Sequence, residues 1–179
     1  MKIVSSTLKR AVGPAVVAGL LVTAAATPAA AQTPGSTVFR IFGGLVGLQA
    51  RAGVANHVTA TLSGTHLILT DSTGVAIGPG CTRVSATSAD CGPVSPGTRL
   101  TVALGDGDDT FDGSTVPVNT TVDAGTGTDA VTTNGGNDLI GVSDNAGGDT
   151  VNCGAQPPGG ADTVFADPGD IVTNCERRF

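Results

Sequence analysis

A short phrase recurs along the second half of the chain: an aspartate, one spacer residue and then an apolar residue. Val122 stands where a further apolar residue is due, with Thr120 in place of the aspartate. The apolar positions 111, 122, 131, 140, 151, 164 and 172 are separated by 11, 9, 9, 11, 13 and 8 residues. A repeat near nine residues predicts a solenoid, in which successive units stack on one another. The phrase occurs at Asp109-Thr110-Phe111, Asp129-Ala130-Val131, Asp138-Leu139-Ile140, Asp149-Thr150-Val151, Asp162-Thr163-Val164 and Asp170-Ile171-Val172.

The chain before this repeat reads as a series of short strands. Residues 58–63 alternate apolar and polar side chains, which indicates a half-buried strand. Residues 37–42, 67–69 and 75–77 are further candidates, bounded by glycine-containing or proline-containing turns. Residues 99–104 predict a strand that runs directly into the first aspartate phrase. Because no long helical period follows residue 31, the sequence predicts an all-β protein in which an N-terminal β segment, 32–103, caps the repeat, 104–175.

The first 31 residues have the pattern of a secretory signal peptide. A basic start is followed by the small and apolar run 11–26, and Ala29-Ala30-Ala31 suits a cleavage site near Ala31–Gln32. We therefore expect a secreted, extracellular chain with no membrane span after cleavage. A retained membrane anchor is the alternative, although the run is short for a span and contains Pro14. Residues 176–179 are expected to form a C-terminal tail.

Charge narrows the possible partners. Removal of residues 1–31 would take away every lysine and move the net charge from −6 to −9. Twelve aspartates lie between Arg99 and Arg177, with no lysine or arginine among them. Carboxylates gathered in this way must repel one another, stay solvated or meet a bound cation. Nucleic acid is not an expected partner, because nothing in this span would neutralise phosphates.

The four cysteines predict two disulfides, because the chain is expected to be exported. Three pairings are possible, and proximity in the sequence favours Cys81–Cys91 and Cys153–Cys175. Metal ligation by thiolates is a competing interpretation, although no CxxC spacing is present and the expected compartment is oxidising.

The repeat unit 104–112 shows what chemistry the pattern could support. Gly105 and Gly107 allow tight turns that can aim main-chain carbonyls inward, and Asp109 follows at the end of the turn. Anionic, oxygen-only ligands suit a hard cation, so Ca²⁺ is the expected cofactor and calcium ions the expected partner; Mg²⁺ fits less well because it demands stricter geometry.

The repeat resembles the nonapeptide β-roll of the RTX, or haemolysin-type, calcium-binding proteins, in a degenerate form. Its consensus is GGxGxDxUx, where U is a large apolar residue. The best copies are LGDGDDTFD (104–112), AGTGTDAVT (124–132) and TNGGNDLIG (133–141). The resemblance implies a right-handed parallel β-roll or β-helix, with ions held between the turns of units i and i+2.

Carried over to this chain, the resemblance implies two edges. One edge holds Asp109, Asp129, Asp149 and Asp170, whereas the other is broken at Thr120, so its first calcium site should be weak. The same register places Cys153 and Cys175 on neighbouring units, where a disulfide would close the end of the stack. The implied metal ligands are Gly105, Gly107, Asp109, Gly125, Gly127, Asp129, Gly135, Gly136, Asp138, Gly147, Asp149, Gly160, Asp162 and Asp170.

Other interpretations remain open. The aspartates could cap turns by local hydrogen bonds in a plain solenoid that needs no ion, as in a cell-surface structural or adhesion protein with a protein or cell-wall partner. An EF-hand is poorly supported because Phe111 occupies the position that needs glycine. No catalytic motif surrounds His57 or His66, so we expect no enzyme and keep a hydrolase only as a third hypothesis.

Overall fold

A computed structural model describes residues 33–156 and 158–179, and it is all-β, as predicted. The expected signal peptide, residues 1–31, lies outside the described residues. Within them the sole helix is the 3₁₀ turn η1 (Phe42–Gly44), and no helix in this part of the chain could cross a membrane.

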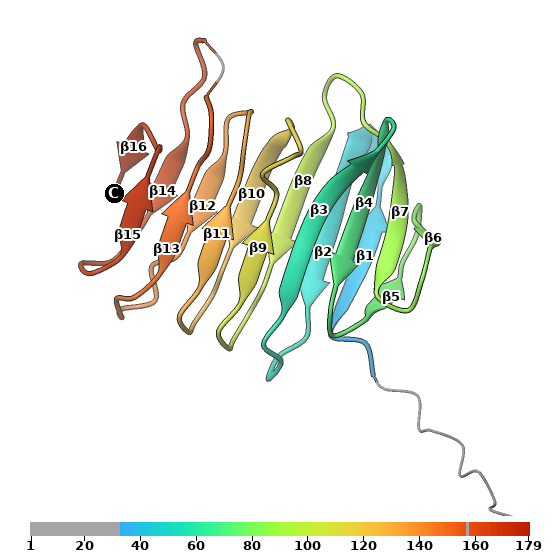
Figure 1. Cartoon of the computed structure of the whole chain (residues 1–179), viewed down its shortest axis with the longest axis horizontal. Coiled ribbons are helices and arrows are strands. Elements are labelled where there is room, and N and C mark those ends of the chain that lie inside the picture. The colour runs from blue at the N-terminus through green and yellow to red at the C-terminus, as the bar shows by residue number, and fades with distance from the viewer. Residues whose placement is uncertain (1–32, 157) are drawn as a thin grey trace, which may run out of the picture. The chain divides into compact units, whose positions relative to one another are not determined.

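Sixteen short strands form two sheets of eight strands each (Figure 1). The first sheet has the order β16-β14-β12-β10-β8-β2-β1-β5, and the second has the order β15-β13-β11-β9-β3-β4-β7-β6. Strands of the first sheet are β1 (Ser36–Arg40), β2 (Leu45–Ala50), β5 (Val75–Ile77), β8 (Arg99–Ala103), β10 (Asn119–Asp123), β12 (Leu139–Gly141), β14 (Thr163–Phe165) and β16 (Arg177–Arg178). Strands of the second sheet are β3 (His57–Ser63), β4 (His66–Asp71), β6 (Thr82–Arg83), β7 (Ser88–Pro93), β9 (Thr110–Asp112), β11 (Ala130–Thr132), β13 (Thr150–Asn152) and β15 (Ile171–Thr173).

Both sheets are mixed, and all antiparallel pairing lies before β8. β1–β2, β3–β4, β4–β7 and β6–β7 pair antiparallel, and Gly64 makes the tight turn between β3 and β4, whereas β1–β5 is parallel. From β8 onward every pairing is parallel, and successive strands go alternately to the first sheet and the second. β2 pairs parallel with β8 and β3 pairs parallel with β9, so both sheets continue through residue 104 without a break. Residues 176–179, expected as a tail, contribute β16, which pairs with β14.

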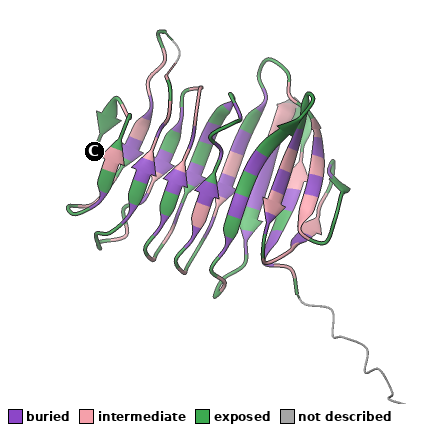
Figure 2. Ribbon diagram, in the orientation of Figure 1, coloured by how far each residue is buried: buried purple, intermediate pink, exposed green. Residues whose placement is uncertain are grey.

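The core is a narrow layer of small apolar side chains between the two sheets (Figure 2). In each short strand of the repeat the central residue faces inward and its neighbours face outward, which is the period-two pattern of a strand. The inward residues predicted from the repeat are at most 2% exposed, apart from Val172 on the terminal strand β15, which is half-buried. The fully buried members are Phe111, Val122, Val131, Ile140, Val151 and Val164.

Both predicted disulfides are present. Cys81 immediately precedes β6 and Cys91 lies within β7, with a Cα–Cα distance of 4.1 Å. Cys153 and Cys175 follow β13 and β15 and lie 5.2 Å apart at Cα, at the end of the second sheet. Disulfides persist in oxidising compartments, so the pairing is consistent with an extracellular protein.

Turn glycines set how closely successive units can approach. Gly105 and Gly125 both have positive φ, +102° and +94°, and occupy equivalent positions in turns of neighbouring units. A Cβ on Gly125 would collide with the main-chain carbonyl of Gly105, whereas a Cβ on Gly105 would meet nothing within 4 Å. The two glycines therefore differ in packing while sharing the same backbone requirement.

Replacing these two glycines by alanine separates backbone strain from packing. Gly105→Ala should cost about 1–3 kcal/mol through φ alone, and Gly125→Ala should cost roughly another 1–3 kcal/mol because a backbone oxygen cannot swing aside. Urea unfolding of the two variants measures the difference. Equal destabilisation would contradict the close approach of these turns.

Candidate functional site

The predicted aspartates form two buried rows, called ladders below, one along each sheet. In both ladders the aspartates stand immediately before a strand. The residues of the first ladder each immediately precede a strand of the second sheet. They are Asn56, Asp109, Asp129, Asp149 and Asp170. The second ladder comprises Thr120, Asp138, Asp162 and Glu176, associated with the first sheet. The strand register places Asp109 beside Asp129, Asp129 beside Asp149 and Asp138 beside Asp162.

Side-chain direction explains why these polar groups are buried. Asp109 lies two residues before the inward Phe111, so strand alternation turns both side chains toward the interior while Thr110 faces outward. The same spacing repeats in every aspartate phrase. The aspartates of both ladders are 0–7% exposed.

One oxygen of each carboxylate in the first ladder is bound by the main chain of the neighbouring unit. The N–H of Asp109 donates to Oδ1 of Asp129 at 2.8 Å, and the N–H of Asp129 donates to Oδ1 of Asp149 at 2.8 Å. The ladder ends where Oδ1 of Asp170 accepts from the N–H of Asp149 at 3.2 Å, and it begins where Oδ1 of Asp109 accepts from the N–H of Asn56 at 2.6 Å. These bonds satisfy buried donors that the short strands leave unpaired.

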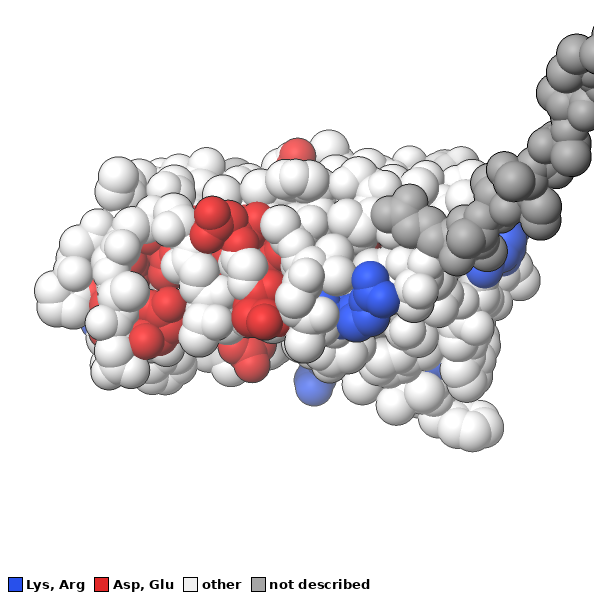
Figure 3. Space-filling model, turned by 90° about the horizontal axis from the view of Figure 1, so that it is seen from below, with Lys and Arg blue, Asp and Glu red and all other residues white. Residues whose placement is uncertain are grey.

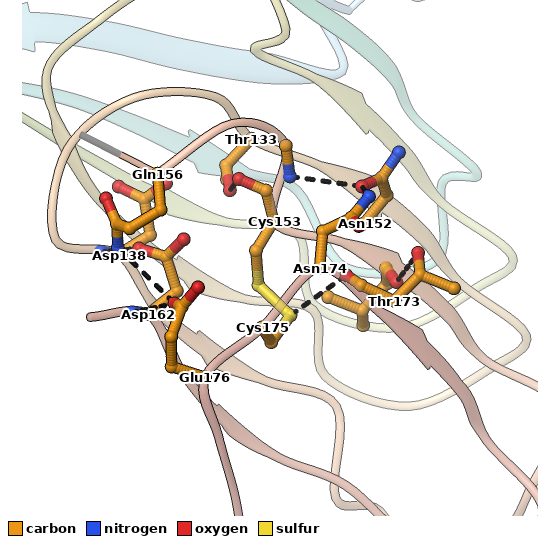
Figure 4. The surroundings of a disulfide bond; sticks show 12 residues. Thr133, Asp138, Asn152, Cys153, Gln156, Asp162, Thr173, Asn174, Cys175 and Glu176 are labelled. Atoms are coloured by element: carbon orange, nitrogen blue, oxygen red, sulfur yellow. Dashed lines mark hydrogen bonds between the residues drawn. A yellow bond between two sulfur atoms is a disulfide. The ribbon is translucent and has the colours of Figure 1, made fainter. Parts of the chain in front are cut away.

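The second ladder repeats this arrangement with different end residues (Figure 4). Oδ1 of Asp138 accepts from the N–H of Thr120 at 2.8 Å, and Oδ1 of Asp162 accepts from the N–H of Asp138 at 2.8 Å. Oε2 of Glu176 then accepts from the N–H of Asp162 at 2.8 Å. Thr120, predicted as the break in this edge, is buried and its hydroxyl donates to the carbonyl of Val118.

The second oxygen of several carboxylates has no partner. Oδ2 of Asp109 and Asp129, in the first ladder, is buried and accepts no hydrogen bond from the described residues. The same holds for Oδ2 of Asp138 and Asp162, although Thr133 and Gln156 lie close enough to lower the pKa of these two carboxyls somewhat. A buried, unpaired carboxylate oxygen is costly, so each of these positions calls for a proton or a cation.

The electrostatic consequence is a set of weak acids. Burial raises the pKa of Asp109, Asp129 and Asp138 from 3.8 to about 6, against the opposing effect of their main-chain or side-chain hydrogen bonds. Burial also raises the pKa of Asp149 and Asp162. In the first ladder the neighbouring carboxylates raise these values further, because like charges oppose ionisation.

A second set of aspartates lies on the turns that precede β9, β13 and β15, and acidic side chains gather on this face in Figure 3. Oδ1 of Asp108 accepts from the N–H of Thr128 at 2.8 Å, and Oδ2 of Asp167 accepts from the N–H groups of Asp144 and Asn145 at 2.7 Å. Oδ1 of Asp106 accepts from the N–H of Gly53 at 2.6 Å. Asp106, Asp108 and Asp167 therefore tie neighbouring turns together.

The predicted glycine ligands fall into two groups. Positive φ occurs at Gly105, Gly107, Gly125, Gly127 and Gly136. It does not occur at Gly135, Gly147 or Gly160; in the later, looser turns Gly148 and Gly159 take the left-handed conformation instead. The carbonyl of Gly105 accepts from the N–H of Thr126 at 2.9 Å, so this predicted ligand is already used between turns.

Sequence reasoning missed both ends of the ladders. Asn56-His57-Val58 repeats the phrase with asparagine in place of aspartate, and Glu176-Arg177-Arg178 repeats its acidic start without the apolar residue. A search that allowed Asn and Glu at the first position would have found both. Gln156 was also missed: its Oε1 is buried and unpartnered, and its Nε2 donates to Oε2 of Glu176 at 3.4 Å.

No protein-family model, curated protein or solved structure matches this chain. Among residues 33–156 and 158–179, no three His, Cys, Asp or Glu side chains converge as a metal-binding group. An ion held here would therefore need main-chain carbonyls, amide oxygens or water beside the carboxylates.

The raised pKa values predict an unusual dependence of stability on pH. A carboxyl whose pKa is higher when folded stabilises the fold below its unfolded pKa of 3.8, and this stability is lost as the pH rises through about 6. With chelator present, the free energy of unfolding should fall between pH 4.5 and pH 7.5 by on the order of 1–3 kcal/mol for each of Asp109, Asp129 and Asp138.

Denaturant unfolding across this pH range tests the expectation. Asp129→Asn keeps an oxygen for the N–H of Asp109 and removes the charge, so it should flatten the profile and be more stable than the parent at pH 7.5. Asp112→Asn is the matched control, because Asp112 is exposed and its Oδ1 likewise accepts a main-chain N–H, that of Ser114. A profile that rises toward pH 7.5 would refute the buried-acid account.

Proposed function

We propose that this protein is a calcium-binding β-roll of the RTX type. The observation that carries the proposal is the set of buried carboxylate oxygens without partners, repeated on successive units of both ladders. Alternation of parallel strands between two sheets supports the roll architecture, with a right-handed path as the expected hand.

The proposed chemistry follows from the two oxygens of each aspartate. Oδ1 is held by a main-chain N–H, which fixes the carboxylate, and Oδ2 is left to a cation. Burial, and after it the repulsion between neighbouring carboxylates, raises the pKa of Asp129. A divalent ion between stacked aspartates would offset both effects. Ca²⁺ suits irregular sets of carboxylate and carbonyl oxygens better than Mg²⁺, which demands near-ideal octahedral geometry.

The proposed sites are unequal. On the first ladder we assign ions to the pairs Asp109 with Asp129 and Asp129 with Asp149, completed by carbonyls of the glycine turns. On the second ladder we assign one ion to Asp138 with Asp162, where the unpartnered oxygen of Gln156 adds a neutral ligand. Thr120 brings no charge, so the position before Asp138 should bind weakly or not at all.

The setting of this function is part of the proposal. Two disulfides suit an oxidising, extracellular compartment, where calcium is abundant and can couple binding to folding. Export through a cleaved N-terminal signal, and the absence of catalytic activity, remain predictions of the sequence.

One observation favours a second candidate, a structural or adhesion protein that needs no metal. Every aspartate of the ladders accepts at least one main-chain hydrogen bond from the unit before it, so the ladders could join the units without any ion. In that case the buried carboxyls would be protonated, and so uncharged, at pH values below their raised pKa.

Calcium titration of the mature chain tests the proposed function. We expect calorimetric heat and an increase in unfolding temperature when Ca²⁺ is added at pH 7.5, where the aspartates need a counter-ion. Stabilisation should reach about 4 kcal/mol when free Ca²⁺ is roughly a thousandfold above Kd. Mg²⁺ at the same concentration should have a smaller effect.

The Asn variants separate the two candidates. Asp129→Asn should remove most of the binding heat, because Asp129 belongs to both sites of the first ladder, and Asp112→Asn should leave it unchanged. The metal-free candidate instead predicts no heat in any variant and a more stable Asp129→Asn protein in chelator and calcium alike. Absence of binding heat in the folded parent protein would overturn the calcium assignment.

A further inference from the structure

A polar groove crosses the outer face of the first sheet, beside the second ladder: Asn119 and Asn137, which line it, immediately precede Thr120 and Asp138. It consists of two adjoining hollows of about 420 and 330 Å³ that share Arg99 and Asn119. The first hollow lies against the loop 94–98 and Pro117, and the second extends over β8, β10 and the start of β12 to Asn137. These strands are adjacent in Figure 1.

The strand register lines up the polar side chains of the groove. Asn119 is the register partner of Arg99, and Thr121 is the partner of both Thr101 and Leu139. Counting back two residues from Leu139 places Asn137 beside Asn119. Arg99, Asn119 and Asn137 therefore stand in one row on successive strands, which lie about 4.8 Å apart.

Hydrogen bonds from main-chain N–H groups determine which side-chain atoms of Asn119 and Asn137 remain available to a ligand. Oδ1 of Asn119 accepts from the N–H of Asn137 at 3.1 Å, and Oδ1 of Asn137 accepts from the N–H of Ala161 at 3.1 Å. Because an N–H can only donate, the oxygen of each amide is used and the NH₂ group is left for a ligand. With the Arg99 guanidinium, the row offers donors alone.

The charges around the groove agree with an anionic ligand. The one ion pair within residues 33–156 and 158–179 is His66–Asp90, so Arg99 has no carboxylate partner there. Arg99 begins β8, at the end of the strand opposite the aspartate-bearing turn that follows Ala103. The unpaired guanidinium and the two NH₂ groups are well suited to carboxylate oxygens.

We propose that this groove binds an acidic oligosaccharide, whose carboxylates accept hydrogen bonds from Arg99, Asn119 and Asn137. Successive side chains of the row are separated by the distance between neighbouring strands, which is similar to the length of one sugar ring. An extended peptide presents side chains on one face only every ~6.8 Å and matches the row less well. The hydroxyls of Thr101 and Thr121, in the next row, can donate to or accept from sugar hydroxyls. Arg99, Asn119 and Asn137 are not among the proposed calcium ligands, so the proposal does not rest on the calcium assignment.

Titration with trigalacturonate tests the proposal, with maltotriose as the neutral counterpart. The titrations are run at low salt in chelator and repeated in calcium, so failure of the calcium sites leaves the result readable. Asn137→Asp keeps the oxygen that accepts from Ala161 and replaces the donor by a carboxylate. It should weaken binding by at least about tenfold, and Arg99→Gln should do the same.

Asn152→Asp is the matched control. It adds the same charge on the second sheet and keeps the oxygen that accepts from the N–H of Gly154, so the affinity should stay within about twofold. Equal weakening by Asn152→Asp and Asn137→Asp would reduce the effect to net charge and overturn the site. Tighter binding of penta-aspartate, equal binding of maltotriose, or equal affinity for sulfate alone would each overturn the oligosaccharide assignment.

Discussion

The hydrogen bond from a main-chain N–H to the buried carboxylate of the next unit is the interaction on which the repeat depends. Strands of three residues leave many main-chain groups at their ends without sheet partners. A short acidic side chain at the entrance of each strand supplies the missing acceptor and fixes the register of the following unit. Burial of like charges is the cost of this solution, and the raised pKa values of Asp109, Asp129 and Asp138 express it.

The core is narrow, and this limits how far the fold can offset the free-energy cost of burying the aspartate charges. Phe111 is the one aromatic side chain among the fully buried core residues, and the rest of the repeat is filled by small aliphatic residues. So thin a layer leaves little hydrophobic energy to spare for buried charge. The two disulfides, one toward each end of the second sheet, constrain the unfolded chain where the sheets have open edges. Ions between the aspartates, as proposed, would remove the remaining cost directly.

The ladders and the groove use the same device in two chemical forms. In the ladders a buried side-chain oxygen accepts a main-chain N–H, and the second oxygen is left for a cation. On the outer face, Asn119 and Asn137 accept main-chain N–H groups in the same way, and their NH₂ groups are left for an anion. Asp and Asn have the same shape, so the stacking is preserved while the free atom changes from acceptor to donor.

The spacing of apolar residues was enough to predict an all-β chain and the inward residues from Phe111 to Val164, because side-chain direction in a strand follows directly from period two. The two edges of aspartates were implied by the resemblance to the RTX repeat. Proximity in the sequence was enough to favour both disulfides. Asn56 and Glu176, which end the ladders, were within reach of a looser sequence pattern. Only the tertiary structure showed that Gly148 rather than Gly147 has positive φ and that Arg177–Arg178 forms a strand. It alone decided which oxygen of each carboxylate is occupied, because that depends on a main-chain donor about twenty residues away, whose position no local pattern determines.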